Sequence, residues 1–165
     1  MAQILVVDDE VGIRELLSEI LSDEGHSVQV AENANAARSL RAEGRPDLVL
    51  LDIWMPDADG ITLLKEWATG GQLTMPVIMM SGHGTIDTAV EATRIGAIDF
   101  LEKPIALQKL LATVKRALRA GESRATTPLS IANFGRSALL TELKKRLARI
   151  SAAGAAVLML SLIHI

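Results

Sequence analysis

The sequence has 165 residues, enough for one domain of ordinary size and part of a second. Apolar residues make up 49% and charged residues 22% of the chain, which is a globular composition and argues against overall disorder. The absence of cysteine excludes disulfides, thiolate metal sites and a thiol nucleophile, so we expect a cytoplasmic protein.

Charge is unevenly distributed along the chain. Residues 1–120 hold 11 basic and 18 acidic side chains, whereas the remainder is net basic. Because affinity for nucleic-acid phosphates comes from clustered Lys and Arg, we expect no DNA binding by the first 120 residues. The uncharged stretch at the end of the sequence, residues 151–165, is shorter than the ~20 residues that span a bilayer, so we expect no membrane anchor there.

Apolar clusters in the first 120 residues alternate between two spacings, which is typical of strands separated by helices. The predicted strands are Gln3–Val7, Ser27–Ala31, Leu48–Leu51, Val77–Met80 and Ala97–Leu101. Helices are predicted between and after them, with apolar stripes over Ile13–Leu21 and Leu107–Leu118, and weaker patterns over Ala34–Glu43, Ile61–Ala68 and Thr85–Ile95. Uniformly apolar strands are expected in a parallel sheet covered on both faces. The sequence therefore predicts a doubly wound α/β domain that ends near Ala120.

The remaining residues are divided by a short polar segment. Residues 121–128 (GESRATTP) are predicted to be a linker. Residues 129–159 contain one amphipathic basic helix and one apolar strand, too little to bury a core alone. Residues 160–165 (LSLIHI) match the translation of a sequencing adapter, so we expect a gene fragment that ends in a second domain and carries an adapter-derived scar.

Polar side chains follow the predicted strands at the edge where a parallel α/β sheet binds ligands. Asp8 and Asp9 follow the first strand, Asp52 closes the third, Ser81 follows the fourth and Lys103 follows the fifth. Three carboxylates about 4 Å apart repel one another by several kcal/mol, so a cation is needed between them. Oxygen ligands are those that Mg²⁺ prefers, and the sequence therefore predicts a divalent cation site.

Asp52 is the candidate nucleophile of this edge. A carboxylate beside a metal can attack phosphorus and form an acyl phosphate. Phosphoryl transfer requires mainly positioning and charge stabilisation, which Mg²⁺ and Lys103 would supply. The hydroxyl of Ser81 is suited to bind a phosphoryl oxygen.

Four segments carry a resemblance to a known family: ILVVDDE at Ile4–Glu10, DLVLLDIWMPDADG at Asp47–Gly60, PVIMMSGHG at Pro76–Gly84 and DFLEKP at Asp99–Pro104. Together they resemble the receiver domain of bacterial two-component response regulators, over essentially all of residues 2–120. The resemblance implies a flavodoxin-like fold of five βα units, with strand order 2-1-3-4-5.

The resemblance also implies roles for individual residues. Asp52 becomes the phosphoacceptor, and Mg²⁺ is bound by Asp9, Asp52 and the carbonyl of Trp54, with Asp8 assisting through water. Lys103 becomes the phosphate-contacting lysine, preceding Pro104 in a peptide that is typically cis.

Ser81 and Phe100 become the switch pair of the receiver. The family often has threonine and tyrosine at these two positions. Phe100 lacks a hydroxyl, so a mechanism that needs a hydrogen bond from the aromatic residue is not expected here.

The segments SGHGTIDTAV at Ser81–Val90 and FLEKP are similar to receivers of NtrC-class activators, including NtrX-like members. Those proteins continue into an AAA+ ATPase that acts on sigma-54 RNA polymerase and then into a DNA-binding domain. Residues 129–159 resemble the start of that ATPase, but no phosphate-binding loop follows in this chain. Contact with DNA or polymerase is therefore expected only through domains missing here.

Three functions remain open from the residues. The first is a switch that receives a phosphoryl group from a histidine kinase, catalyses only its own modification, and forms a homodimer when phosphorylated. The second is a Mg²⁺-dependent aspartyl-phosphate phosphatase, although such enzymes carry the nucleophile in a D-x-D pattern on the first strand. The third is an adaptor whose binding does not depend on phosphorylation.

Overall fold

The computed structural model describes residues 1–83 and 85–125. The predicted ATPase fragment at 129–159, the residues 160–165 and the end of the predicted linker lie outside them. The strands are β1 (Gln3–Val7), β2 (Ser27–Ala31), β3 (Leu48–Asp52), β4 (Val77–Ser81) and β5 (Asp99–Glu102). The helices are α1 (Val11–Asp23), α2 (Ala34–Glu43), α3 (Gly60–Thr69), α4 (Ile86–Ile95) and α5 (Leu107–Ala125). None of the helices in the described part is long and apolar enough to cross a membrane.

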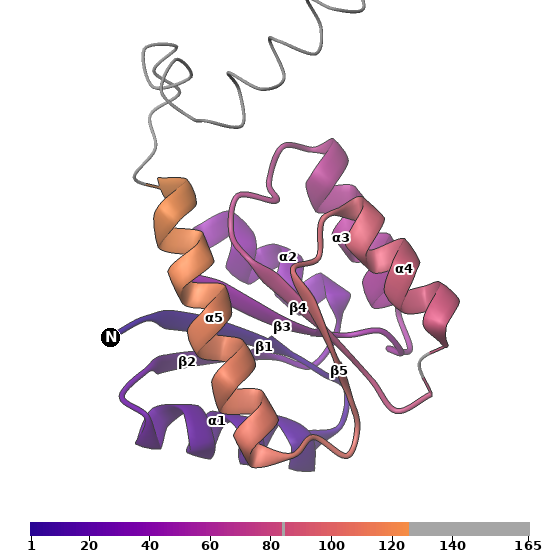
Figure 1. Ribbon diagram of the computed structural model, residues 1–165. Helices are drawn as coiled ribbons and strands as arrows, with labels where there is room; N and C mark the ends of the chain where they lie inside the picture. Colours follow the sequence, from indigo (N-terminus) through magenta and orange to yellow (C-terminus); the bar gives the residue numbers. More distant parts are fainter. Residues whose placement is uncertain (84, 126–165) are drawn as a thin grey trace, which may run out of the picture. The chain divides into compact units, whose positions relative to one another are not determined.

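The five strands form one parallel sheet in the order β2-β1-β3-β4-β5, which confirms the predicted fold. Helices α1 and α5 lie on one face of the sheet and α2, α3 and α4 on the other (Figure 1). Strand order reverses between β1 and β3, because the chain moves outward to β2 and then returns past β1. Ligands of open α/β sheets bind at such a switch point.

Each face of the sheet has its own hydrophobic core because successive side chains of a strand point in opposite directions. Ile4 and Val6 pack with the α1 and α5 side. Leu5 and Val7 pack with the α2, α3 and α4 side, where Trp67 is also buried. Burial on both faces explains why the central strands are apolar without alternation.

The end of the domain differs from the prediction. Residues 121–125, predicted to begin a linker, are the last residues of α5. Gly121, the first residue of the predicted linker, is a point of close approach, since a Cβ there would lie 3.1 Å from Cδ of Pro76. Local sequence favours a helix end near Ala120, because glycine is a poor helix former. The helix nevertheless continues to Ala125, and Gly121 packs against Pro76, the residue before β4.

The loop between β3 and α3 folds back tightly onto the end of β3. The Gly60 amide donates a hydrogen bond to the Ile53 carbonyl, with a nitrogen to oxygen distance of 2.8 Å. A Cβ at Gly60 would lie only 2.1 Å from the Asp52 carbonyl oxygen, so glycine is required here. Asp59 caps α3, its Oδ1 accepting from the Thr62 amide at 2.7 Å.

Candidate functional site

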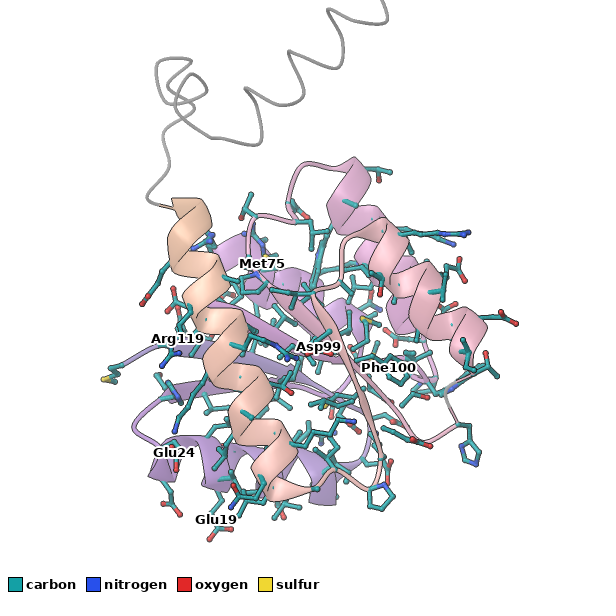
Figure 2. All side chains as sticks on the ribbon, in the orientation of Figure 1. Glu19, Glu24, Met75, Asp99, Phe100 and Arg119 are labelled. Carbon is teal, nitrogen blue, oxygen red and sulfur yellow. The ribbon has the colours of Figure 1, made fainter. Side chains whose placement is uncertain are left out.

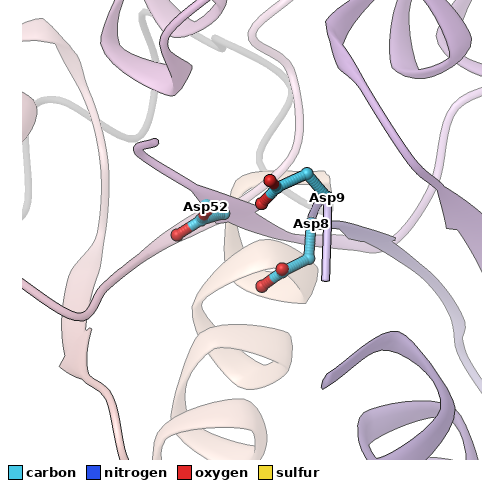
Figure 3. Close-up of side chains that lie close together, drawn as sticks. All are labelled: Asp8, Asp9 and Asp52. Carbon is cyan, nitrogen blue, oxygen red and sulfur yellow. The ribbon is translucent and has the colours of Figure 1, made fainter. Parts of the chain in front are cut away.

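Three carboxylates meet at the carboxyl ends of β1 and β3. Asp8, Asp9 and Asp52 each place a carboxylate oxygen within 4.8 Å of the other two (Figure 3). Asp8 is fully buried and Asp52 is 2% exposed, whereas Asp9 faces solvent. The structure therefore brings together the acids that the sequence placed at this edge.

Lys103, immediately after β5, inserts its ammonium among these acids. Its Nζ lies 2.8 Å from Asp8 Oδ2 and 3.2 Å from Asp52 Oδ1. A third contact, at 3.3 Å, is to Oε1 of the exposed Glu10. The Lys103–Pro104 peptide is cis, as the resemblance implied. One ammonium thus offsets part of the repulsion within the cluster.

Burial perturbs the titration of the central pair. Burial raises the pKa of Asp52 from 3.8 to about 6, against the lowering effect of Lys103 and with a further rise from the charge of Asp8. Burial acts to lower the pKa of Lys103, but contact with Asp8 and the charge of Asp52 outweigh it and raise that pKa. A buried carboxylate with a raised pKa is common where an acid does chemistry.

The unused bonding capacity of the cluster suits a hard cation. Asp8 Oδ2 and Asp52 Oδ1 are buried and, apart from the ion pair with Lys103, neither has a hydrogen-bond partner among the described residues. Oxygen atoms of this kind are the ligands that Mg²⁺ takes, with water completing its shell. The acids open onto a hollow of about 530 Å³ that is lined by Asp9, Glu10, Ile13, Asp52, Trp54, Gly82, His83, Lys103 and Pro104. The residues present therefore fit a magnesium ion with an open side toward solvent.

Two contributors to the site were not predicted. Glu10 pairs with Lys103, and its amide donates to Asp8 Oδ1 at 2.9 Å. Arg14 on α1 donates from Nη1 to the backbone oxygens of Asp8 at 2.6 Å and Asp9 at 2.9 Å. The acidic run after β1 contained Glu10, but no local signal shows that a side chain from the second turn of α1 reaches back to these carbonyls.

Ser81 and Phe100 are not among the residues that line the hollow. Ser81 is fully buried at the end of β4, and its Oγ accepts a hydrogen bond from the His83 amide at 3.1 Å. Phe100 and Asp99 are neighbours on β5 (Figure 2). Phe100 is half-buried and packs against the core on the α2, α3 and α4 side, while Asp99 pairs with Arg116 of α5. Ser81 and Lys103 are linked directly, since the Lys103 amide donates to the Ser81 carbonyl at 2.8 Å.

The fold and this acid cluster agree with a comparison to known families. The response regulator receiver domain family matches residues 4–115, about two thirds of the chain. The chain belongs to this family. The five-stranded parallel sheet, with a buried acid at the end of β3, is therefore the fold of a receiver domain.

Relatives of this receiver domain include whole response regulators. It is 44% identical to a putative NtrX-like response regulator of Rickettsia bellii over 71% of this chain and 25% of the relative. It is 38% identical to the nitrogen assimilation regulatory protein NtrX of Azorhizobium caulinodans over 89% of this chain and 34% of the relative. The chain thus spans between a quarter and about a third of the length of these relatives.

Solved structures give the same result for the receiver fold. The receiver domain of NtrX from Brucella abortus is 48% identical, with a TM-score of 0.66 over 70% of this chain and 98% of that one. A CheY-like receiver domain protein from Methanospirillum hungatei is 30% identical, with a TM-score of 0.70 over 74% of this chain and 98% of that one. This receiver domain is therefore similar to NtrX-like receivers along its described length.

Proposed function

We propose that this receiver domain is a phosphorylation-activated switch of a two-component system and that Asp52 accepts the phosphoryl group. The observation that carries the proposal is the position of Asp52, which is 2% exposed yet lines the hollow beside Asp8 and Lys103. A carboxylate oxygen of Asp52 attacks phosphorus and forms a P–O bond. The P–N bond to the histidine of the donor kinase breaks, and the imidazole leaves with the electron pair.

Asp9, Asp52 and the carbonyl oxygen of Trp54 would hold Mg²⁺ at this site, with Asp8 acting through water. Trp54 lines the hollow together with Asp9 and Asp52, which supports this ligand set. When bound, the ion neutralises charge on the transferring phosphoryl group. Lys103 would then pair with a phosphoryl oxygen rather than with Asp52 alone.

The switch uses Ser81 and Phe100. A phosphoryl group adds about two negative charges, which attract the Ser81 hydroxyl toward Asp52 and away from its present partner, the His83 amide. This movement opens space into which the ring of Phe100 rotates. Since a few kcal/mol suffices to reverse a two-state equilibrium, one new hydrogen bond and one repacked ring are enough. The resulting change on α4, β5 and α5 favours a homodimer of the phosphorylated form.

The domain acts in the cytoplasm with a sensor histidine kinase as its donor, and its chemistry is confined to its own phosphorylation and dephosphorylation. Residues 121–128 lead into residues 129–159, the start of an AAA+ sigma-54 interaction domain, and residues 160–165 are an adapter-derived scar. The match to NtrX of A. caulinodans supports this arrangement, because it covers 89% of the chain and so continues beyond residue 125. Contact with DNA and sigma-54 RNA polymerase would occur through domains missing here.

Phosphorylation by a small phosphodonor tests the assignment of Asp52. In the presence of Mg²⁺, mass spectrometry should find one added phosphoryl group that hydroxylamine removes, as an acyl phosphate requires. Asp52→Asn keeps the shape but removes the nucleophile, and Asp59→Asn is a control on the same loop. Equal phosphorylation of Asp52→Asn and wild type would refute the proposal.

Assays on the same protein distinguish the switch from the other two functions, the phosphatase and the adaptor. A phosphatase would turn over exogenous phosphate esters many times per molecule, whereas the switch incorporates one group per chain. An adaptor would show the same mass in sedimentation and the same amide exchange over α4 and α5 with and without a phosphate mimic. The position of the candidate nucleophile on β3, rather than on β1, favours the switch.

A further inference from the structure

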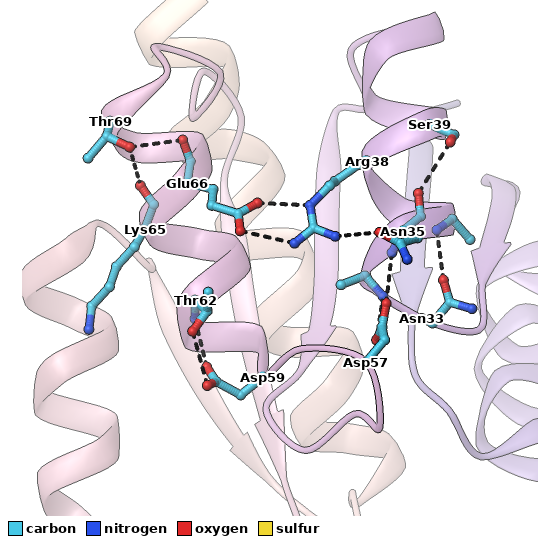
Figure 4. Close-up of polar contacts among 12 residues, drawn as sticks. Asn33, Asn35, Arg38, Ser39, Asp57, Asp59, Thr62, Lys65, Glu66 and Thr69 are labelled. Carbon is cyan, nitrogen blue, oxygen red and sulfur yellow. Dashed lines mark hydrogen bonds and ion pairs between the residues drawn. The ribbon is translucent and has the colours of Figure 1, made fainter.

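The loop between β3 and α3 is attached to a helix that contributes no side chain to the hollow. Asp57, three residues after Trp54, reaches the first turn of α2 (Figure 4). Its Oδ1 accepts a hydrogen bond from the Ala34 amide at 3.1 Å, and its Oδ2 accepts one from the Asn35 amide at 3.0 Å. The loop therefore binds the N-terminus of α2 through both oxygens of one carboxylate.

This contact is charge-assisted. The first amides of a helix lack partners within the helix and carry its partial positive charge, so an anion there is favoured. Burial acts to raise the pKa of Asp57, but the amides of Ala34 and Asn35 outweigh it and hold the pKa below its ordinary value. Asp57 is therefore ionised at neutral pH and remains attached to α2.

Helix α2 already has a cap of its own. The N-cap residue Asn33 accepts a hydrogen bond from the Ala36 amide through Oδ1 at 2.8 Å. Asp57 binds the two preceding amides, so the two caps do not compete. The chain thus offers two side chains that stabilise the same helix end, of which only Asp57 belongs to the loop.

The backbone around Trp54 has other attachments besides Asp57, and they come from its neighbours rather than from the indole. The Trp54 side chain is 58% exposed, so its indole does little to fix the backbone. At the base of the loop the Gly60 amide binds the Ile53 carbonyl, and Met55 is buried in the core. The peptide between Trp54 and Met55, which carries the Trp54 carbonyl, lies between two buried residues, Ile53 and Met55, and Asp57 attaches the loop to α2 two residues after Met55.

We infer that Asp57 is a positioning residue for the metal site, fixing the loop so that the Trp54 carbonyl faces the ion. The inference rests on the proposed magnesium site. It assigns Asp57 no contact with metal or phosphoryl group, because its carboxylate is engaged with α2. Loss of this attachment should let the carbonyl turn away and so weaken Mg²⁺ binding, while Asp8, Asp9 and Asp52 stay in place.

Two alanine variants separate positioning from simple stabilisation of α2. Asp57→Ala removes the cap that belongs to the loop, and Asn33→Ala removes the helix's own cap. Each should lower the melting temperature, since each variant loses one of the two caps of α2. Titration with MgCl₂, followed through Trp54 fluorescence, then measures the midpoint for Mg²⁺ in the full chain.

Asp57→Ala should raise that midpoint about tenfold, the lower end of the range for groups that orient metal ligands, whereas Asn33→Ala leaves it within about twofold. Without metal, amide exchange over residues 53–58 should speed up in Asp57→Ala only. Asp57→Asn keeps one acceptor oxygen and should fall between Asp57→Ala and wild type. Should Asp57→Ala fold poorly, Asp57→Asn makes the same comparison.

The inference would be overturned if wild type and Asp57→Ala had the same midpoint for Mg²⁺. It would also be overturned if Asp57→Ala and Asn33→Ala shifted that midpoint equally. Asp9→Ala distinguishes this failure from failure of the proposed function. If wild type responds to Mg²⁺ and Asp9→Ala does not, the metal site stands and only the role of Asp57 falls. If wild type itself shows no response to Mg²⁺, both are wrong.

Discussion

Replacing Asp52 with asparagine should stabilise the metal-free protein at pH 7, and the gain should disappear in acid. Asp52 lies buried among other acids, and burial raises its pKa to about 6. The folded protein therefore binds a proton at Asp52 under conditions in which the unfolded chain has already released it. Ionising Asp52 in the folded state costs free energy of folding, and asparagine avoids that cost.

The sign and size of this stability difference follow from the linkage between proton binding and folding. Between pH 3.8 and about 6 the folded state binds more protons at Asp52 than the unfolded state, so stability falls as pH rises through this window. A rise of about two pKa units corresponds to about 3 kcal/mol. Because asparagine resembles the neutral acid, Asp52→Asn should gain up to about 3 kcal/mol at pH 7 and almost nothing at pH 4.

Urea unfolding in the presence of a chelator measures this difference. The buried Trp67 of α3 provides a fluorescence signal for loss of the core. Unfolding free energies of wild type and Asp52→Asn are compared from pH 4 to pH 8, with Glu43→Gln at the exposed end of α2 as a control for removing one charge. A difference that does not change with pH, or an Asp52→Asn variant less stable than wild type at pH 7, would refute the reasoning.

Three further predictions test other parts of the domain. Asp9→Ala removes an acid from the cluster, so without Mg²⁺ it should melt at a higher temperature than wild type. It should also lose the metal-induced rise in melting temperature, and retention of that rise would show that Asp9 is not a ligand. Gly60→Ala forces a methyl group against the Asp52 carbonyl and should cost at least 1–3 kcal/mol in urea unfolding, roughly the cost of overpacking, together with slower phosphorylation of Asp52. A chain cut after Ala120 should melt about 4 °C below one cut after Ala125, if the last turn of α5 contributes about 1 kcal/mol, and equal melting temperatures would place the domain end at Ala120.

The arrangement of the acid cluster could be predicted from sequence because it follows from topology. Parallel strands end at the same edge, so residues that follow β1, β3 and β5 must meet there once the strand order is known. Asp8, Asp52 and Lys103 satisfy this condition, and their contacts agree with it. The central strands β1, β3 and β4 were recognisable because burial on both faces leaves them almost entirely apolar.

The parts that could not be predicted depend on contacts between distant residues. Asn33 carries a local capping signal, since a short polar side chain precedes a helix. Asp57 caps the same helix from 23 residues away in sequence, and nothing in its neighbourhood indicates that partner. The end of α5 was misplaced for a similar reason, because the proximity of Gly121 to Pro76 is visible only in the folded chain.

The charge balance at the hollow indicates the order in which ligands should bind. Among the described residues, Asp8, Asp9, Glu10 and Asp52 supply four carboxylates, and the ammonium of Lys103 pairs with three of them, those of Asp8, Glu10 and Asp52. With Asp52 ionised, this group has an excess of three negative charges, and a phosphoryl group adds about two more. A phosphodonor approaching this cluster without a divalent cation meets strong repulsion in a partly buried site. Mg²⁺ should therefore bind before phosphorus reaches Asp52, and the rate of phosphorylation should rise with Mg²⁺ concentration until the metal site is filled.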